Sequence, residues 1–236
     1  MKRSTTESLA TDNCLMTWVK ICGITNLEDA RLAVDAGADA VGFVFHEKSP
    51  RKVDVETARA IVAELPARVE KVGVFVEQSA DMIREIAKRT GLTIVQVPAG
   101  AAGELLKTLA GAKSKSPKLV LAIRADQIQE SFFIAEELKK ETYAVLIDSG
   151  SAAAPGGTGT TFDWRKKRDI LRSMASTIPV VIAGGLRSTN VSEAIGTFRS
   201  FGVDVASGVE ARPGKKDPEK VRAFVRAVRE TDRKVV

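Results

Sequence analysis

The sequence predicts an α/β protein that folds as a single-domain (βα)₈ barrel. Short apolar runs alternate with segments of helical periodicity, and this unit recurs eight times. The chain has 236 residues, which is close to the roughly 250 residues typical of such a barrel. Strict alternation of strands and helices predicts a parallel sheet with right-handed crossovers, and eight units can close that sheet without free edges.

The eight apolar runs are the expected strands. They are continuously apolar, which is typical of parallel strands that are covered on both faces. An open doubly wound sheet is the alternative, but it usually carries a Gly-x-Gly-x-x-Gly turn after its first strand. Here that turn reads Cys22-Gly23-Ile24-Thr25-Asn26 and does not fit. In chain order the expected strands are Trp18–Cys22, Ala40–Phe45, Lys71–Val76, Thr93–Val97, Leu119–Ile123, Ala144–Ile147, Val180–Ala183 and Val203–Ala206.

Eight helices are expected between and after these strands. The last one shows the pattern clearly, because Val221, Phe224, Val225 and Val228 recur at helical spacing. Its arginines occupy other positions and predict a basic, solvated face: Arg222, Arg226, Arg229 and Arg233. The expected helices cover residues 27–36, 54–64, 79–90, 101–111, 127–140, 163–175, 188–199 and 218–230.

The first residues of the chain differ in character from the rest. Residues 1–16 are polar and aperiodic and predict a flexible extension that precedes a barrel domain over 17–236. They contain no apolar core like that of a secretory signal, and no apolar run reaches the length of a membrane span. Two cysteines, Cys14 and Cys22, are too few for a disulfide framework, so a reduced, cytoplasmic location is expected.

The net charge of +6 does not by itself indicate nucleic acid. Residues 212–236 hold nine Lys or Arg and four Asp or Glu, so most of the excess lies in the last helix and just before it. Aromatic residues make up only 5%, and no nucleic-acid recognition motif is present. We therefore expect a small-molecule partner, with no nucleic acid and no membrane, and either a monomer or a homodimer.

Glycine-rich segments follow the last three expected strands and predict a phosphate site. Glycine lets backbone N–H groups converge on an anion, and phosphate bound by the last two loops recurs in this fold. Any one of these turns alone is more often only a tight turn, whereas three at the same end of a barrel favour phosphate. The segments are Pro155–Thr161 with Gly157, Ala183–Ser188 with Gly184 and Gly185, and Ser207–Glu210 with Gly208. Asn190, near the start of the seventh helix, is expected to cap that helix.

Three side chains, two at strand ends and one in the loop after a strand, are candidates for catalysis or substrate binding. Cys22 ends the first strand and is followed by Gly23, although a buried apolar cysteine is the simpler interpretation. Asp148 follows three apolar residues, where a carboxylate is costly to bury without a partner or a purpose. Arg51, in the second loop, could hold a substrate carboxylate with paired donors, or could simply be exposed.

Other site chemistries are disfavoured. One histidine and two cysteines argue against zinc, and no nucleophile elbow of a serine hydrolase is present. His46 is expected to be a solvent-facing loop residue. No metal or cofactor is therefore expected.

Taken together, the motifs resemble phosphoribosylanthranilate isomerase of tryptophan biosynthesis. The resemblance runs from about Val19 to Phe224, and although each piece is weak alone, the ordered set is specific. The matching segments are Lys20–Thr25, Gly42–Phe45, Ser49–Arg51, Val72–Val76, Gly156–Gly159 with Phe162–Trp164, Ala183–Leu186 and Asp204–Glu210.

The resemblance implies an Amadori rearrangement of N-(5-phosphoribosyl)anthranilate without metal or cofactor. It implies that Cys22 is the general base, that Asp148 is the general acid and that Arg51 holds the anthranilate carboxylate. A free Asp is only about 0.1% protonated at neutral pH, so the acid role requires surroundings that favour the protonated carboxyl. The residues implied to surround the phosphate are Gly157, Gly184, Gly185, Ser207 and Gly208.

One position departs from the family pattern. After the fourth strand the family usually reads Gln-Leu-His-Gly, whereas this chain reads Gln96-Val97-Pro98-Ala99-Gly100. Two alternatives also stay open. One is another phosphosugar-handling barrel enzyme, which would need strand-end lysine and glutamates or a metal with histidines. The other is a non-catalytic barrel that binds a phosphometabolite, which would need neither Cys22 nor Asp148.

Overall fold

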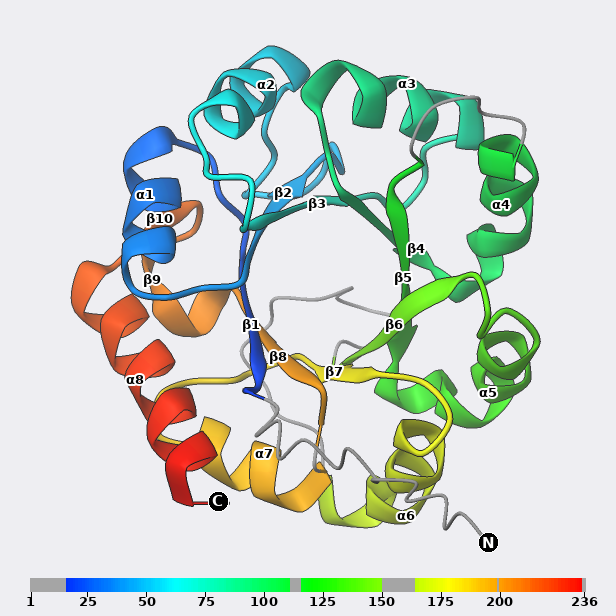
Figure 1. Ribbon diagram of the computed structural model, residues 1–236, viewed down its shortest axis with the longest axis vertical. Helices are drawn as coiled ribbons and strands as arrows, with labels where there is room; N and C mark the ends of the chain where they lie inside the picture. Colours follow the sequence, from blue (N-terminus) through cyan, green and yellow to red (C-terminus); the bar gives the residue numbers. More distant parts are fainter. Residues whose placement is uncertain (1–15, 111–115, 150–163, 199, 235–236) are drawn as a thin grey trace, which may run out of the picture.

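The computed structural model describes residues 16–110, 116–149, 164–198 and 200–234. Within these ranges the chain forms a closed barrel of parallel strands in the order β1 to β8, and β1 pairs with β8 (Figure 1). The predicted barrel is confirmed. The strands are β1 (Trp18–Cys22), β2 (Ala40–Val44), β3 (Glu70–Val74), β4 (Ile94–Pro98), β5 (Lys118–Arg124), β6 (Thr142–Asp148), β7 (Val180–Ile182) and β8 (Gly202–Val205).

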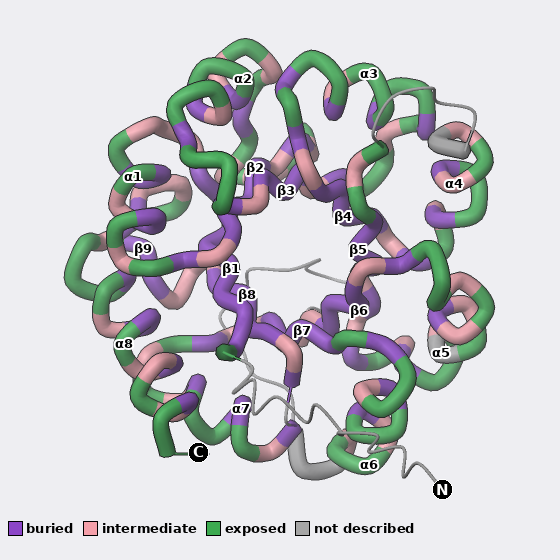
Figure 2. The backbone as a smooth tube through the Cα atoms, in the orientation of Figure 1, coloured by how far each residue is buried: buried purple, intermediate pink, exposed green. Residues whose placement is uncertain are grey.

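Helices form the outer ring of the barrel (Figure 1). Figure 2 shows that the strands are mostly buried, whereas the outward surfaces of the helices are exposed. Side-chain oxygens cap the first three helices: Asn26 accepts from the Asp29 N–H, Asp54 from Thr57 and Ser79 from Met82. The helices are α1 (Leu27–Asp35), α2 (Val55–Ala63), α3 (Ala80–Thr90), α4 (Ala102–Ala110), α5 (Ile128–Glu137), α6 (Trp164–Ala175), α7 (Val191–Phe198) and α8 (Pro218–Lys234).

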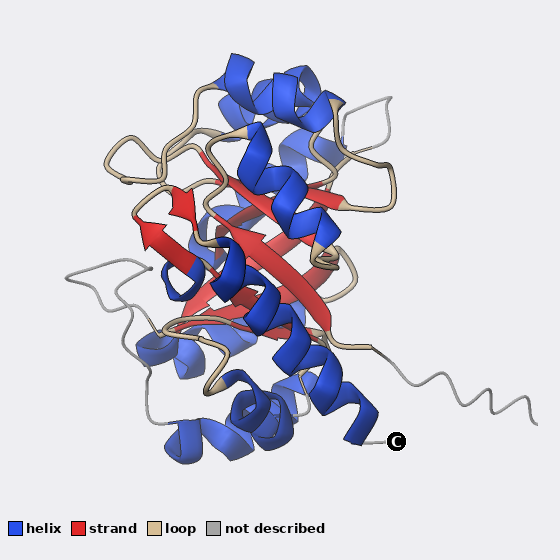
Figure 3. Cartoon of the chain, turned by 90° about the vertical axis from the view of Figure 1, so that its left-hand side faces the viewer, coloured by secondary structure: helices blue, strands red, loops and turns tan. Residues whose placement is uncertain are grey.

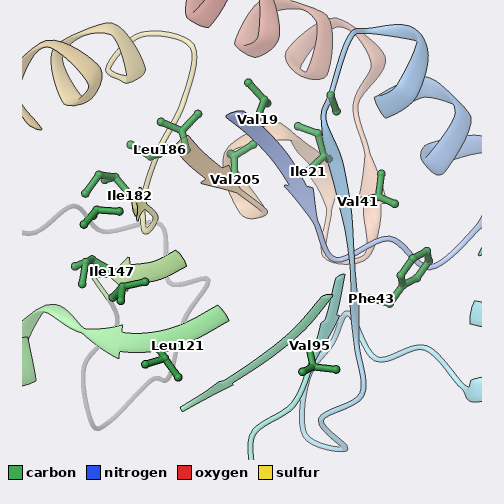
Figure 4. Close-up of a cluster of buried hydrophobic side chains, with 14 of the residues drawn as sticks. Val19, Ile21, Val41, Phe43, Val95, Leu121, Ile147, Ile182, Leu186 and Val205 are labelled. Carbon is green, nitrogen blue, oxygen red and sulfur yellow. The ribbon is translucent and has the colours of Figure 1, made fainter. Parts of the chain in front are cut away.

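Alternate strand residues face two different cores. Val19 and Ile21 point outward and belong to the large apolar cluster between the barrel and its helices (Figure 4). Trp18 belongs to a second cluster, which is built from inward-facing residues such as Val72 and Ile94. On β1 this alternation leaves Lys20 and Cys22 on the inner face, above Trp18.

A short hairpin extends from the C-terminal end of the barrel and was not predicted. It consists of β9 (Glu210–Arg212) and β10 (Lys215–Lys216), joined by a turn in which Gly214 has φ 78°. It follows a 3₁₀ turn over Ser207–Val209, and in Figure 1 it lies beside α1 and α8. Its two strands are too short to show a periodic pattern in the sequence.

The last helix, α8, packs along the outside of the barrel and ends near the C-terminus (Figure 3). The predicted apolar face is confirmed, since Val221, Phe224, Val225 and Val228 are all buried. The predicted solvated position of Arg229 is wrong, because the residue is half-buried. Its guanidinium donates to the Thr17 and Gly37 carbonyls and pairs with Asp39. No helix in the described ranges has the length and apolarity needed to cross a membrane.

Candidate active site

Most residues predicted to bind phosphate lie together at the C-terminal end of the barrel. One pocket is lined by Gly184 and Gly185 after β7 and by Ser207 and Gly208 after β8. Asp148, the last residue of β6, lines the same pocket. The structure thus places the predicted acid beside two of the predicted phosphate loops. Gly157, in the third such loop, lies outside the described residues.

The backbone of these two loops requires glycine. Gly184 and Gly185 have φ of 86° and 63°, in the left-handed region that other residues rarely adopt. Gly208 has a different reason, because a Cβ there would collide with the carbonyl oxygen of Leu186. The two loops therefore approach each other backbone to backbone. Such packing leaves N–H groups free of side-chain bulk where an anion can reach them.

Asn190 shapes the loop between β7 and α7. Its side-chain oxygen accepts from the Arg187 N–H at 2.8 Å, and its amide nitrogen donates to the Gly185 carbonyl at 3.1 Å. The expected helix-capping role is therefore wrong, since the side chain turns back into the loop. Asn190 instead fixes the carbonyl of Gly185 and so the orientation of a phosphate-loop peptide.

Cys22 ends β1 on the inner face of the barrel and is buried, with 7% of its surface exposed. Burial raises the pKa of its thiol, and the Asp204 carboxylate raises it further. Lys20 and Lys216 act in the opposite direction and favour the thiolate, but burial outweighs them and the pKa of Cys22 stays above its ordinary value. The surroundings of Cys22 are thus strongly charged, unlike those of an ordinary core cysteine.

Arg51 lies in the loop after β2 and is held by a carboxylate that the sequence did not indicate. Its Nε and Nη2 each donate to Glu210 at 2.8 Å, in a two-point ion pair. This hydrogen bonding raises the pKa of the Arg51 guanidinium. Of its five N–H donors the pair uses two, so among the described residues three remain for a ligand.

Lys216, on the unpredicted hairpin, ties together three parts of the site. Its ammonium is fully buried and donates to the Cys22 carbonyl at 2.6 Å and to Glu210 at 3.1 Å. Burial lowers the pKa of Lys216, although Glu210 opposes that change. The backbone N–H of Lys216 donates to Asp29 on α1 at 2.8 Å, which anchors the hairpin to the first helix.

His46 and Pro98 also lie near this end of the chain's strands, and the structure shows the surroundings of each. His46 was expected to face solvent, but it is half-buried, and its Nδ1 is buried without a hydrogen-bond partner in the described part of the chain. Pro98, which replaces the family histidine, ends β4 and pairs with Ala122 of β5. The described residues contain no cluster of three or more His, Cys, Asp or Glu able to hold a metal ion.

Comparison with known proteins now decides the family. The family model for N-(5'-phosphoribosyl)anthranilate isomerase matches residues 19–227. The chain belongs to this isomerase family. Its activity is accordingly that of an aldose–ketose isomerase of tryptophan biosynthesis. An N-(5'-phosphoribosyl)anthranilate isomerase from Pelobacter propionicus is 44% identical over 216 residues, which cover 92% of this chain and 97% of the relative.

Solved structures agree with this assignment. The structure of monomers of a dimeric phosphoribosylanthranilate isomerase from Thermotoga maritima superposes with a TM-score of 0.74 at 36% identity. That match covers 91% of this chain and all of the other. A phosphoribosylanthranilate isomerase in complex with reduced 1-(o-carboxyphenylamino)-1-deoxyribulose 5-phosphate gives the same TM-score, identity and coverage.

Sequence reasoning assigned no role to four residues of the isomerase that the fold brings to Cys22 or to its neighbours: Lys20, Asp204, Lys216 and Glu210. Lys20 and Asp204 did carry a signal, because each is a charge inside an apolar strand, as Asp148 is. Applying the same burial argument to them would have marked both. Their pairing could not be foreseen, because it depends on the register of β1 against β8, which sets Lys20 opposite Asp204 across 184 positions.

Proposed function

We propose that the isomerase acts on N-(5'-phosphoribosyl)anthranilate with Asp148 as general acid and Cys22 as general base. The observation that carries the proposal is the shared pocket of Asp148 with Gly184, Gly185, Ser207 and Gly208. A substrate whose phosphate occupies the glycine loops has its sugar within reach of the β6 strand end. Cys22 approaches from β1 at the same end of the barrel.

The chemistry needs one acid and one base in turn. Asp148 donates a proton to the furanose ring oxygen, the bond from C1 to that oxygen breaks, and the nitrogen lone pair forms a Schiff base. The Cys22 thiolate then takes the proton from C2, which gives an enolamine. Protonation at C1 and loss of the C2 hydroxyl proton yield the ketone. No atoms are gained or lost, and no redox partner is required.

The remaining residues orient the substrate. Arg51, fixed by Glu210, is placed in the β2 loop and holds the anthranilate carboxylate with its free N–H donors. Gly157 joins the phosphate loops in this proposal, on the sequence pattern alone. A flexible extension over 1–16, a cytoplasmic location and the choice between monomer and homodimer stay predictions.

The proposal is tested by making the labile substrate in situ with anthranilate phosphoribosyltransferase and following the loss of its fluorescence. Cys22→Ser and Asp148→Asn should each lower kcat by about 10²- to 10⁴-fold, because each removes one proton-transfer partner. Cys14→Ser is the matched control and should leave kcat unchanged. Near-normal turnover in both site variants would refute the assignment. Phosphate binding without any isomerisation by the unmodified protein would favour the non-catalytic barrel instead.

A further inference from the structure

Lys20 is a buried charge at the centre of the barrel. Only 1% of its side chain is exposed. Its ammonium donates to Asp204 on β8 at 2.9 Å and to Gln96 on β4 at 3.1 Å. A buried ion pair is weak grounds for stability, since well-packed apolar residues commonly do as well. Packing therefore gives no reason for a lysine at this position.

Lys20 and Cys22 lie side by side over one glycine. They are two residues apart on β1 and so share its inner face. A Cβ placed on Gly42 of the neighbouring strand would lie 2.8 Å from the Cys22 sulfur and 3.0 Å from the Lys20 Cε. Gly42 therefore provides the space in which the thiol and the lysine side chain meet, and any larger residue would force them apart.

The charges around Cys22 leave one positive charge to be balanced. The cations are Lys20 on β1, Lys216 on β10 and Arg51 in the β2 loop. The anions are Asp204 on β8 and Glu210 on β9, so the cations number three and the anions two. Asp148, which lines the pocket with Asp204, adds no charge in the protonated form that its acid role requires. A thiolate at Cys22 brings the sum to zero.

We propose that Lys20 is a positioning residue that stabilises the Cys22 thiolate when the thiol loses its proton, with Asp204 and Gln96 fixing its ammonium. The inference rests on the proposed role of Cys22 as the base. It assigns opposite effects to the two members of one ion pair. Lys20 favours the thiolate, whereas Asp204 disfavours it directly and also draws the ammonium toward itself.

The test compares Lys20→Met with Asp204→Asn in a Cys14→Ser background, where Cys22 is the single thiol. Ionisation of Cys22 is followed directly by its alkylation rate with iodoacetamide and by thiolate absorbance against pH. Lys20→Met should move the ionisation of Cys22, and with it the rising acid limb of the kcat profile, to higher pH by about one pH unit or more. Asp204→Asn should move both to lower pH.

Structural damage cannot produce this result, because both substitutions break the same ion pair. The inference is overturned if the ionisation of Cys22 moves in the same direction in both variants, or does not move in Lys20→Met. Lys20→Gln provides a second variant that keeps a donor for Asp204, and it should shift Cys22 in the same direction as Lys20→Met. Lys71→Met is the matched control, since Lys71 is also a buried strand lysine but donates to the Pro66 carbonyl. It should leave the ionisation of Cys22 unchanged.

The two proposals fail in different ways. Full activity in Cys22→Ser would remove the base role, and with it the reason for a thiolate, whatever the titration shows. If Cys22→Ser is inactive but the ionisation of Cys22 is unchanged in Lys20→Met, the base role stands and the positioning role alone is refuted.

Discussion

The Glu210 carboxylate forms ion pairs with two cations, Arg51 and Lys216. It accepts two hydrogen bonds from Arg51 and one from Lys216, and its side chain is only 4% exposed. Burial raises the pKa of Glu210, but the hydrogen bonds from Arg51 and the charge of Lys216 outweigh burial and hold the pKa below its usual range. The residue therefore fixes the Arg51 guanidinium and the hairpin at the same time.

Replacing Glu210 by Gln should cost both stability and substrate affinity. The change leaves Arg51 and Lys216 buried without their anion, which lowers the free energy of unfolding by about 3 kcal/mol. Loss of the two-point hold on Arg51 should raise KM by about 10-fold. Urea denaturation and steady-state kinetics check these values. Glu64→Gln, which breaks an exposed pair with Arg31, should cost no more than about 1 kcal/mol. Equal losses in the two variants would contradict this prediction.

At the scale of elements, the helix α8 is bonded to the residues that begin β1 and β2. Asp232 accepts from the Thr17 hydroxyl at 2.5 Å, and Arg229 pairs with Asp39 at 2.8 Å. Both contacts lie at the N-terminal end of β1, opposite the candidate site. In this fold the N-terminal face carries stability and the C-terminal face carries function. Figure 3 shows how far α8 runs along the barrel.

We expect Arg229→Met to destabilise the protein without altering catalysis. It removes hydrogen bonds to two carbonyls and the ion pair with Asp39, which keeps, among the described residues, only the hydrogen bond from the Val19 N–H. The free energy of unfolding should therefore fall by about 2–4 kcal/mol. At a temperature where the variant is folded, kcat and KM should match the unmodified protein. Arg226→Met, on the exposed face of the same helix, should change stability by less than about 0.5 kcal/mol. A change in kcat without a change in stability would disprove the separation of the two ends.

At the scale of the whole molecule, ionised carboxylates connect separate parts of the barrel. Asp29 on α1 binds the Lys215 ammonium and the Lys216 N–H of the hairpin. Burial raises the pKa of Asp29, but these hydrogen bonds and one from Asn26 hold it below its usual range. Together with Glu210, it makes the attachment of the hairpin depend on pH.

Stability should therefore fall in acid. A folded-state pKa below the unfolded value, which is about 3.9 for Asp and 4.3 for Glu, gives stability that is present above the unfolded value. That stability is lost as pH falls through the lower folded-state pKa. Asp29→Asn should cost about 2 kcal/mol at pH 7 and should flatten the acid decline in urea-derived unfolding free energies. Asp81→Asn, at an exposed carboxylate, should keep the original curve. A decline in Asp29→Asn parallel to that of the unmodified chain would contradict this origin.

Local sequence patterns were enough to predict the barrel and the order of its strands, and they assigned the candidate site to the C-terminal ends of the strands. Continuous apolar runs such as Ala40–Phe45 are readable because each records burial on both faces, and that burial is a local property of the strand. The candidates Cys22 and Asp148 were readable for a related reason, since each ends such a run. Strand boundaries therefore agree within a few residues.

Which charged side chains meet depends on the three-dimensional fold. Lys20 and Asp204 are neighbours because β1 closes against β8, and Glu210 reaches Arg51 across 159 positions through a hairpin too short for a periodic pattern. Arg229 appeared solvated on its helix, yet it bonds to the residues at the start of β1 and β2. Coulomb and hydrogen-bond energies depend on distances of a few ångströms, which a closed barrel creates between residues remote in sequence. The sequence thus marked Cys22 as a candidate, and the fold decided which charges surround it.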